Sequence, residues 1–538
     1  MQIKRKEIVS CLYKYLQGQW GKILLLWIAT ALTQLYLLIN PQIYGLLIQN
    51  VIMQKQKRSM VVVGVGLALI YLLRFVGDWL KIRSNNQIEN NLVTKLRKEI
   101  FDKIFKKTYS EFLKKDNGDW RLNLLEDVEL VSSFISKQLV EYYIALAGCI
   151  LCAILLLKMN WLLTIMEVAI VIVFFVIQIA FGKKQGKIME KIRQIDTDYY
   201  SFEFRTFQNW KEIRAEQGEN VIRNEYDTKL KTKATWGLKQ IKYWCINEIL
   251  NEFELNYLCK VCIYILSIPF MLHSRLMLSE VIVFVMYFQS FYMELSKIKD
   301  ANINLNIYSS QYKRIIELLN EKNQDNKEYK GKVKQIIMNN VDFSYHNSEK
   351  LILKNFSTIF RENSKYMICG KSGTGKSTLL MLLAGIYFPN NGKMLVNDSN
   401  NYKVNREKMG VVFQNDQLYH ESIVDNICVG EKFDPVKWNK VISDCCLQNV
   451  IKQHGKNYII HENGGNLSGG ERQRILIARQ LYKQPEILIL DEATCALDLS
   501  TEGRIFENIC NINTLSMVIF VTHREDMSRF ATKQLYIK

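Results

Sequence analysis

A glycine-rich loop in the second half of the chain carries the residue types that hold a phosphate chain. The run GKSGTGKST, from Gly370 to Thr378, follows the apolar stretch 366–369 and precedes an apolar helical run that begins at Leu379. A GxxxxGK[ST] pattern between a strand and a helix is a phosphate-binding loop. Its glycines let backbone N–H groups close around phosphate oxygens, Lys376 neutralises the β- and γ-phosphates, and Ser377 offers an oxygen to Mg²⁺. The predicted nucleotide contacts are Gly370, Lys371, Ser372, Gly373, Thr374, Gly375, Lys376, Ser377 and Thr378.

Two adjacent acids follow a second apolar run, which covers residues 487–490. Transfer of a phosphoryl group to water needs a carboxylate near the metal ion and a second group that positions or deprotonates the water. We therefore assign Asp491 to Mg²⁺ and Glu492 to the attacking water. The alternative, a charged strand end without chemistry, is the weaker interpretation because the phosphate loop is intact.

The run LSGGERQR, from Leu467 to Arg474, lies between these two motifs, and through it the chain resembles the ATP-binding cassette (ABC) transporters. The resemblance implies that these signature residues contact ATP: Leu467, Ser468, Gly469, Gly470 and Glu471. Four further positions fall in the order of the family's motifs. The resemblance implies that Tyr345 stacks on adenine and that Gln414 contacts Mg²⁺ or water. It also implies that Asp498 belongs to the D-loop and that His523 contacts the γ-phosphate. A strand-face tyrosine and a structural histidine are the alternatives.

Other positions resemble the family less closely. Glu462 resembles the X-loop acid of exporters, and Cys495 stands where serine is more common, a small change that we expect to leave turnover intact. The run GDWRLNLLEDV, residues 118–128, is similar to the family's GDLxSRLxxDV but departs from it at Leu122 and Asn123. We expect the interactions of the arginine that is usual there to be replaced.

Six apolar stretches occupy the first 300 residues, and with their flanks each approaches the roughly 20 residues that cross a bilayer core of ~30 Å. They are residues 23–39, 60–75, 139–157, 161–181, 258–272 and 278–292. Hydrophobic residues make up 49% of the chain and charged residues 23%, a balance typical of a protein partly in the membrane and partly in water. Buried helices of a large soluble protein are the disfavoured alternative.

Basic connectors orient these spans. The 71 Lys and Arg exceed the 53 Asp and Glu, for a net charge of +18, and many of them lie in residues 81–137 and 183–242, which we place in the cytoplasm. The short connectors 158–160 and 273–275 then face outside. This predicts a multi-pass protein of the cell (plasma) membrane, with both termini and the nucleotide-binding domain cytoplasmic, whose charge requires no nucleic-acid partner.

The expected fold class is membrane α-helical, with six transmembrane helices and long cytosolic extensions, plus an α/β P-loop nucleotide-binding domain of ABC type. The apolar residues of the cytosolic connectors keep helical spacing, so we expect the helices to project about 35–40 Å beyond the bilayer. The expected domains are residues 1–323 and 332–538, joined by a polar linker at 324–331. By resemblance, residues 109–115 and 204–214 are the coupling helices.

The resemblance implies an exporter-type half-transporter, an ATP hydrolase whose turnover is coupled to transport with ATP and Mg²⁺ as cofactors. The partners are a second half-transporter, the lipid bilayer and an exported substrate. A homodimer is favoured because Glu492 and Ser468 are both intact. By family analogy, the first choice of substrate is a peptide: a bacteriocin, a signalling peptide or a modified peptide. The alternatives are a lipid or multidrug/small-molecule exporter and an ATP-gated channel or regulatory membrane ATPase.

One acid interrupts the fourth apolar stretch. Glu167 lies about 10 Å along that helix from its outer end, at ~1.5 Å per residue. A carboxylate at this depth must be paired, protonated or exposed to a wet cavity. Two interpretations stay open: a structural hydrogen bond to another helix, or a contact on the substrate path with a cationic or hydrogen-bonding part of the cargo.

Overall fold

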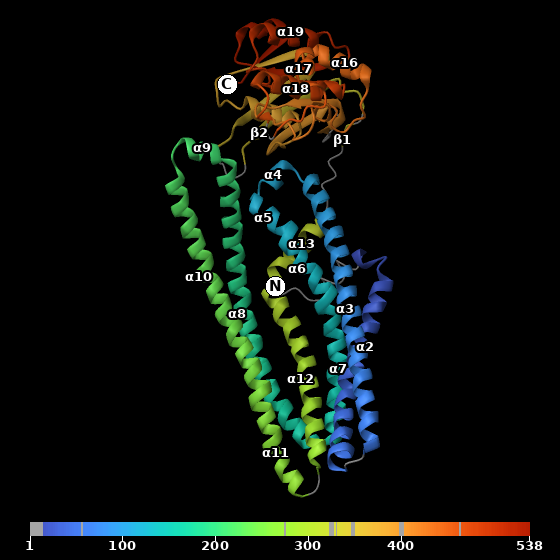
Figure 1. Ribbon diagram of the computed structural model, residues 1–538. Coiled ribbons are helices and arrows are strands. Elements are labelled where there is room, and N and C mark those ends of the chain that lie inside the picture. The colour runs from blue at the N-terminus through green and yellow to red at the C-terminus, as the bar shows by residue number, and fades with distance from the viewer. Residues whose placement is uncertain are drawn as a thin grey trace. The chain divides into compact units, whose positions relative to one another are not determined.

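The structure, a computed structural model, describes residues 14–54, 57–273, 276–321, 328–329, 331–345, 350–397, 403–461 and 464–537. The chain divides into two compact units. The first comprises Met1–Lys107 and Lys114–Asn323, and the second comprises Thr108–Leu113 and Gln324–Lys538. The first unit consists of long helices, whereas the second contains sheets and shorter helices (Figure 1).

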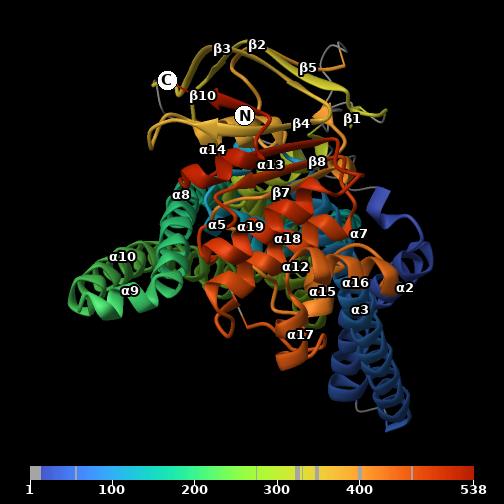
Figure 2. The same cartoon turned by 90° about the horizontal axis from the view of Figure 1, so that it is seen from above.

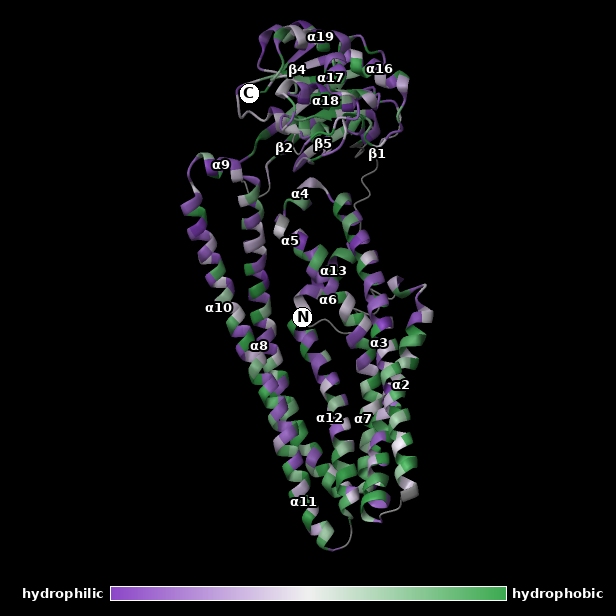
Figure 3. Ribbon diagram, viewed as in Figure 1, coloured by the Kyte–Doolittle hydropathy of each residue, from purple (hydrophilic) through white to green (hydrophobic). Residues whose placement is uncertain are grey.

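Six helical stretches of the first unit are long and apolar enough to cross a membrane, which confirms the six predicted spans. They are Trp20–Met53, Ser59–Lys106, Gly118–Met159, Trp161–Gln208, Glu219–Leu272 and Leu278–Ile307. Apolar residues gather where α11 (Lys260–Leu272) meets α12 (Leu278–Ile307), and polar residues dominate the far half of α10 (Glu219–Glu252) (Figure 3). The apolar half therefore matches a bilayer and the polar half matches water.

Two spans continue far beyond the bilayer as unbroken helices. The helix α3 (Lys57–Lys106) has 50 residues and α8 (Trp161–Gln208) has 48. At ~1.5 Å per residue each is about 70–75 Å long, some 40 Å more than a ~30 Å bilayer core requires. This confirms the predicted extensions. Asn160 starts α8 sharply, because its side chain accepts a hydrogen bond from the backbone N–H of Leu163 at 3.1 Å.

Three other spans are continuous helices with π-helical stretches, where one extra residue widens a turn, whereas the sixth is α-helical throughout. The first joins α2 (Trp20–Leu46) to the π-helical Leu47–Met53. The third runs through α5 (Asn117–Leu122), Asn123–Asp127, α6 (Val128–Ser133), Phe134–Leu139 and α7 (Val140–Met159). The fifth joins α10 through Phe253–Cys259 to α11.

The helix α12 is the central packing element of the membrane unit. Its apolar window is 56% buried, against 17–28% for the other five spans. Phe284, Phe288 and Tyr292 form a core with Cys152 of α7 and Val171 of α8. The outer helices instead expose large apolar side chains, as a surface suited to contact with lipid does: on α3 these include Val61, Val62, Leu69, Leu72 and Phe75.

Three short helices lie at the connections. The predicted coupling segment 109–115 forms α4 (Tyr109–Phe112), whose N-terminus carries a capping box between Thr108 and Glu111. The segment 204–214 is split, because residues 204–208 still belong to the last turn of α8 and α9 covers Trp210–Ala215. The amphipathic α13 (Ser309–Asn320) follows α12 and buries Tyr312, Ile315 and Leu318.

The second unit is built on a five-stranded parallel sheet with the order β10-β4-β9-β8-β7. Its strands are β4 (Ser364–Cys369), β7 (Met409–Val412), β8 (Ile487–Asp491), β9 (Met517–Val521) and β10 (Lys533–Tyr536). A three-stranded antiparallel sheet, β3-β2-β5, contains β2 (Gln335–Phe343), β3 (Leu353–Arg361) and β5 (Asn391–Val396). The two-residue strands β1 (Glu328–Tyr329) and β6 (Lys403–Val404) pair with each other.

Alternate residues of β8 face two separate cores. Ile487 and Ile489 pack with α14 (Lys376–Leu383) and the three-stranded sheet, while Leu488 and Leu490 pack with α18 (Gly469–Tyr482) and α19 (Leu499–Cys510). Figure 2 shows the three-stranded sheet and the helices α18 and α19 on opposite sides of the five-stranded sheet. The short helices α15 (Ile423–Ile427), α16 (Pro435–Asp444) and α17 (Gln448–His454) join the α18 side.

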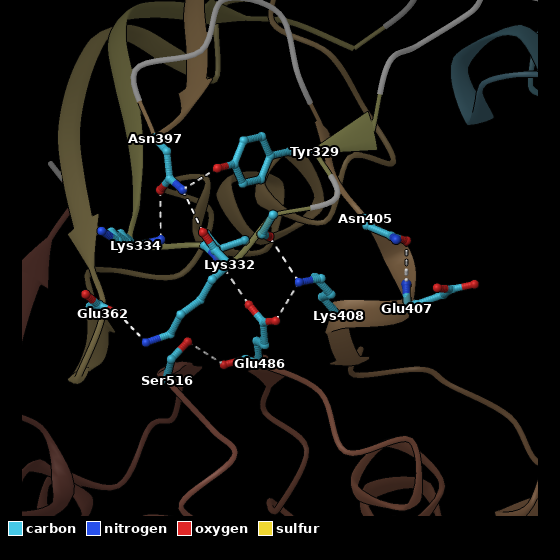
Figure 4. A network of polar contacts seen from close by, with 12 residues as sticks. Tyr329, Lys332, Lys334, Glu362, Asn397, Asn405, Glu407, Lys408, Glu486 and Ser516 are labelled. Carbon is cyan, nitrogen blue, oxygen red and sulfur yellow. Dashed lines mark hydrogen bonds and ion pairs between the residues drawn. The ribbon is translucent and has the colours of Figure 1, made fainter.

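A polar network fastens the start of the second unit to its sheets (Figure 4). The Asn397 side chain accepts hydrogen bonds from the backbone N–H groups of Lys334 and Gln335 at 2.7 and 2.9 Å. Its NH₂ donates to the Tyr329 hydroxyl and to the carbonyl of Lys332, at 3.0 and 2.7 Å. Part of the segment expected as a linker is thus a strand bonded to the domain.

The residue before β8 supports the same segment from the other side (Figure 4). Glu486 accepts a hydrogen bond from the backbone N–H of Val333 at 3.1 Å and pairs with Lys408 at 2.6 Å. Lys408 also donates to the carbonyl of Gly331 at 3.0 Å. Lys408 and Glu486 directly precede β7 and β8, so the network reaches the strands that lead to Gln414 and Asp491.

Candidate nucleotide site

Four predicted site segments meet at one edge of the parallel sheet. The phosphate loop follows β4, Gln414 follows β7, Asp491 ends β8, and His523 follows β9. These four strands are consecutive and parallel in the sheet, in the order β4-β9-β8-β7, so their carboxyl ends lie along the same edge. In open α/β sheets ligands bind at this edge. The fold therefore brings together residues that are up to 153 positions apart in the sequence, from Gly370 to His523.

The phosphate loop has the backbone geometry that its glycines predict. Gly375 lies at φ +98°, and a Cβ there would come within 2.8 Å of Ile352, so only glycine fits. The helix α14 begins directly afterwards at Lys376, which directs its first N–H groups and positive dipole end toward the loop. The Lys376 ammonium is largely buried and donates to the carbonyls of Gly370 and Lys371 at 2.9 and 3.0 Å. These contacts hold the cation inside the loop.

Asp491 has the surroundings of a metal-binding carboxylate. It is 2% exposed, and burial raises its pKa, while a hydrogen bond from Ser377 opposes that shift. Its Oδ1 is buried and has no hydrogen-bond partner among the described residues. A free buried carboxylate oxygen beside a serine hydroxyl matches the oxygen ligands that Mg²⁺ prefers. The residues present therefore fit the predicted magnesium site.

Glu492 is held by two of the predicted catalytic side chains. The Gln414 amide donates to its Oε2 at 2.8 Å, and Nε2 of His523 lies 2.7 Å from its Oε1. Glu492 also adopts a left-handed backbone conformation, φ +51°, which costs about 1–3 kcal/mol for a residue other than glycine. Strain of this kind is common where a side chain must point to one place.

Tyr345 lies beside the phosphate loop. Its hydroxyl is 2.7 Å from that of Thr378, in the first turn of α14. Its ring packs edge-on against Phe343 and Tyr387, with centroids 5.2 and 5.4 Å away. This position beside the loop fits the predicted contact with the base, which stays a prediction.

The signature forms the N-terminus of α18. Ser468 caps the helix in a reciprocal capping box with Glu471: its hydroxyl accepts from the backbone N–H of Glu471, and its own N–H donates to the Glu471 carboxylate at 2.8 Å. Gly469 and Gly470 allow close packing on Ala496, because an added Cβ would come within 3.2–3.3 Å of that segment. The signature is thereby fixed to the residues that follow Glu492.

The D-loop residue Asp498 caps α19. It accepts hydrogen bonds from the backbone N–H of Thr501 at 2.9 Å and from the Ser500 hydroxyl at 2.6 Å. These bonds hold the pKa of this exposed carboxyl well below its usual range. The capping bonds fix the direction in which the chain leaves the 495–498 turn.

Sequence reasoning missed the polar residues behind this turn. Arg524 pairs with the buried Glu502 and donates to the carbonyl of Leu497 at 2.9 Å. Gln473 accepts from the backbone N–H of Ala496 at 2.8 Å and donates to the Cys495 sulfur at 3.0 Å. The adjacency of Arg524 to His523 was the available signal. Cys495 is exposed in the turn, and Glu462 lies outside the described residues.

Two arginines surround the motif in which Asn123 stands where the family usually has arginine, and whether they replace that arginine's interactions stays a prediction. Asp127 is fully buried and pairs with Arg193 of α8 at 3.0 Å and with Arg314 of α13 at 3.2 Å. Asn123, at the position where the family usually has arginine, accepts from Arg193 at 3.4 Å. Two arginines, from α8 and α13, thus form ion pairs with the carboxylate of this motif.

Glu167 lies inside the membrane unit. It is 0% exposed on α8, and both carboxylate oxygens are buried, with the Cys259 thiol as a polar neighbour. Glu167 directly precedes Val168 and lies one turn before Val171, and both valines belong to a core that α7, α8, α11 and α12 share. Its role on a substrate path stays a prediction.

Comparison with known families agrees with both halves of this architecture. Residues 23–295 match the family model of the ABC transporter transmembrane region, and residues 353–495 match that of the ABC transporter. The first match alone covers half of the chain.

Relatives span most of its length. The ATP-dependent lipid A-core flippase of Haemophilus ducreyi is 26% identical, over 85% of this chain and 80% of that protein. The lactococcin-G-processing and transport ATP-binding protein LagD of Lactococcus lactis is 23% identical, over 90% and 70%. A bacterial Atm1-family ABC exporter solved with ATP bound has the same fold, with a TM-score of 0.82, 20% identity, and coverage of 98% and 94%. This chain therefore belongs to the ABC transporters, as an exporter-type half-transporter whose ATP hydrolysis is coupled to transport.

Proposed function

We propose that two copies of this chain form a homodimer that exports a peptide across the cell membrane. The observation that carries the ATP-driven part is the arrangement of Glu492 between Gln414 and His523, beside the phosphate loop. The proposed catalytic residues are these three, and the proposed ATP contacts are the loop, Tyr345, the signature and Asp498.

Hydrolysis in this site follows from the positions of the side chains. The water oxygen attacks the γ-phosphorus while the bond to the ADP oxygen breaks, and Glu492 accepts the proton of the water. Gln414 and His523 keep the Glu492 carboxylate in one orientation before the reaction. Lys376 stabilises the charge that develops on the β- and γ-phosphates.

Three residues would hold Mg²⁺: Asp491 through its free Oδ1, Ser377 through its hydroxyl, and Gln414 through its amide oxygen. When bound, the ion supplies positive charge that neutralises the phosphate oxygens. Burial of Asp491 supports this assignment, because an unpaired buried carboxylate is costly unless a cation compensates it.

The homodimer rests on the intact signature. By family resemblance, the signature of one copy closes over ATP bound at the phosphate loop of the other, and Ser468, Lys376 and Glu492 are all present for two complete sites. Closure by ATP requires that ATP bind the closed state more tightly than the open state. We propose that α4 and α9 pass this closure to the spans. Within the second unit, the Tyr109 ring of α4 lies 5.5 Å from the Tyr387 ring, which supports that role for α4.

The proposed orientation of the spans in the membrane follows from the distribution of positive charge. The basic extensions of α3, α8 and α10, and with them the nucleotide-binding unit and both termini, lie in the cytoplasm of the cell, according to the positive-inside rule. A relative named for lactococcin-G processing and transport supports peptide as the cargo. A relative named as a lipid A-core flippase supports lipid as the second candidate.

Transport in inverted membrane vesicles tests the proposal. We expect ATP-dependent accumulation of peptide inside vesicles that contain the wild-type chain, and none with Glu492→Gln. Accumulation of a labelled lipid in the opposite leaflet, without peptide uptake, would replace peptide by lipid. Peptide-independent ion current gated by ATP would instead identify a channel.

A further inference from the structure

A cavity of about 430 Å³ opens between three helices of the membrane unit. Gln185 of α8, Gln240 of α10 and Asn304 of α12 contribute carboxamides to its wall. Trp244 and Tyr308 contribute aromatic rings, and Ile241 and Ile307 contribute aliphatic side chains. The volume lies within the range of pockets that bind small ligands, roughly 300–1,000 Å³.

The lining of this cavity is uncharged and contains three carboxamides. None of the seven lining residues carries a charge, although lysines are frequent in the neighbouring sequence. A carboxamide has one acceptor oxygen and two donor hydrogens, so it can match both the C=O and the N–H of another amide. Gln240 contacts the Met189 sulfur at 3.7 Å, a weak acceptor, which leaves its hydrogen-bonding capacity available to a ligand.

A buried polar network lies about two helical turns from the cavity, closer to the outer end of α8. Gln178 lies two turns before Gln185 on the same face of α8, and Asn251 lies two turns after Trp244 on α10. Gln178 donates to Asn251 at 2.8 Å, and the Lys299 ammonium of α12 donates to the same oxygen at 2.5 Å. Gln178 and Lys299 are 0% and 3% exposed. A buried ionisable residue such as Lys299 inside a membrane helix is costly and often marks a substrate or ion path.

The cavity lies near the cytosolic boundary of the spans. Gln185 follows Trp161, the outer end of α8, by 24 positions, or roughly 36 Å along the axis, just beyond a ~30 Å bilayer core. A cargo that arrives from the cytoplasm would reach this cavity first and the polar network next.

We propose that this cavity binds an uncharged, amide-bearing segment of the cargo, that is, a stretch of peptide backbone with neutral side chains. The inference rests on the proposed peptide export and adds the place and the chemical class of recognition. The carboxamides of Gln185, Gln240 and Asn304 pair with peptide groups, and Trp244 and Tyr308 cover their apolar faces. A lipid acyl chain would leave those amides unpaired, which is costly.

Peptide-stimulated ATP hydrolysis by the full-length protein in phosphatidylethanolamine and phosphatidylglycerol liposomes tests this site. The probes are three short peptides with blocked ends: one uncharged and rich in Gln, Asn and Gly, one basic and one acidic. Gln240→Leu and Asn304→Leu keep the side-chain size but remove the amide, and both positions are only half buried, so these variants are expected to fold. Gln194→Leu, at an exposed position of the same α8, is the matched control.

We expect the uncharged peptide to stimulate the wild type at the lowest concentration. Each pocket variant raises its half-maximal concentration roughly 2- to 10-fold, and Gln194→Leu leaves it unchanged. Equal concentrations for all variants, or a preference for a charged peptide, would overturn the site while peptide export stands. Failure of every peptide, with stimulation by a labelled phosphatidylethanolamine instead, would overturn peptide export and this inference together.

Discussion

Nε2 of His523 lies 2.7 Å from Oε1 of Glu492, while Gln414 occupies the other carboxylate oxygen at 2.8 Å. Side chains from the ends of β7, β8 and β9 thus form one unit, centred on the carboxylate that we propose activates water. His523 is 62% exposed in its side chain but Glu492 only 17%. The histidine is therefore open to solvent, whereas the glutamate is mostly buried and is held by two partners.

The first prediction concerns the Glu492 carboxylate. Glu492→Gln keeps the side-chain size but removes the proton acceptor, so we expect ATP binding to persist and hydrolysis to fall by at least about 100-fold. Phosphate release measures turnover, and trapping of labelled ATP in a closed dimer measures binding. Glu507→Gln, an exposed change on α19, serves as the control. Near-normal turnover of the Glu492 variant would remove this residue from the role.

The second prediction is that each ATP site draws on two chains. Lys376→Ala removes the positive charge that we place against the β- and γ-phosphates, so this variant should bind ATP more weakly. Ser468→Arg should block the signature that closes over the partner's ATP. Either variant alone is expected to be inactive, whereas a mixed dimer keeps one undamaged site and should recover part of the ATPase activity. Full activity of a verified monomer would contradict the dimer.

The third prediction concerns the buried carboxylate of Asp127. Asp127→Asn leaves Arg193 and Arg314 facing a neutral amide, and loss of one partner from a buried ion pair costs about 3–5 kcal/mol. We expect a clearly lower thermal midpoint for the full-length protein. Glu129→Gln removes the exposed pair with Arg97 and should change stability by no more than about 1 kcal/mol. Similar midpoints for the two variants would show that the Asp127 cluster contributes little.

The fourth prediction concerns the network in Figure 4. Asn397→Ala removes four hydrogen bonds and places alanine at φ +49°, so we expect a loss of about 2–4 kcal/mol. Asn397→Asp keeps the acceptor oxygen and tolerates the backbone, so its loss should be smaller. Thermal unfolding of the full-length chain compares the two, and an equal loss would show that the acceptor oxygen does not contribute.

Local patterns account for what the sequence predicted well. The phosphate loop is contiguous, and its glycines and Lys376 act through the backbone of that same segment. The six spans are equally local, because each needs only one apolar run. The long extensions followed from the helical spacing of apolar residues.

Long-range pairing accounts for what it missed. Asp127 meets Arg193 and Arg314, which lie 66 and 187 positions away. Asn397 bonds to Tyr329 across 68 positions. From the sequence alone, each of these polar residues looks like an ordinary surface residue, because the sequence does not show which distant residue it contacts. The π-helical stretches are equally hidden, because they depend on packing between helices rather than on a local residue pattern.

The last prediction separates the two interpretations of Glu167. In the structure its carboxylate is fully buried beside the Cys259 thiol, and Glu167 lies 18 positions before Gln185 on α8 and is not among the residues that line that cavity. We therefore expect a structural role, in which Glu167→Gln keeps hydrogen bonding and size while it removes the charge. Thermal stability, transport and the half-maximal peptide concentration should then match the wild type, whereas Glu167→Ala should destabilise the unit by leaving a cavity. If Glu167→Gln weakens only the response to a basic peptide, with unchanged stability, the carboxylate contacts the cargo during transport and belongs to the path.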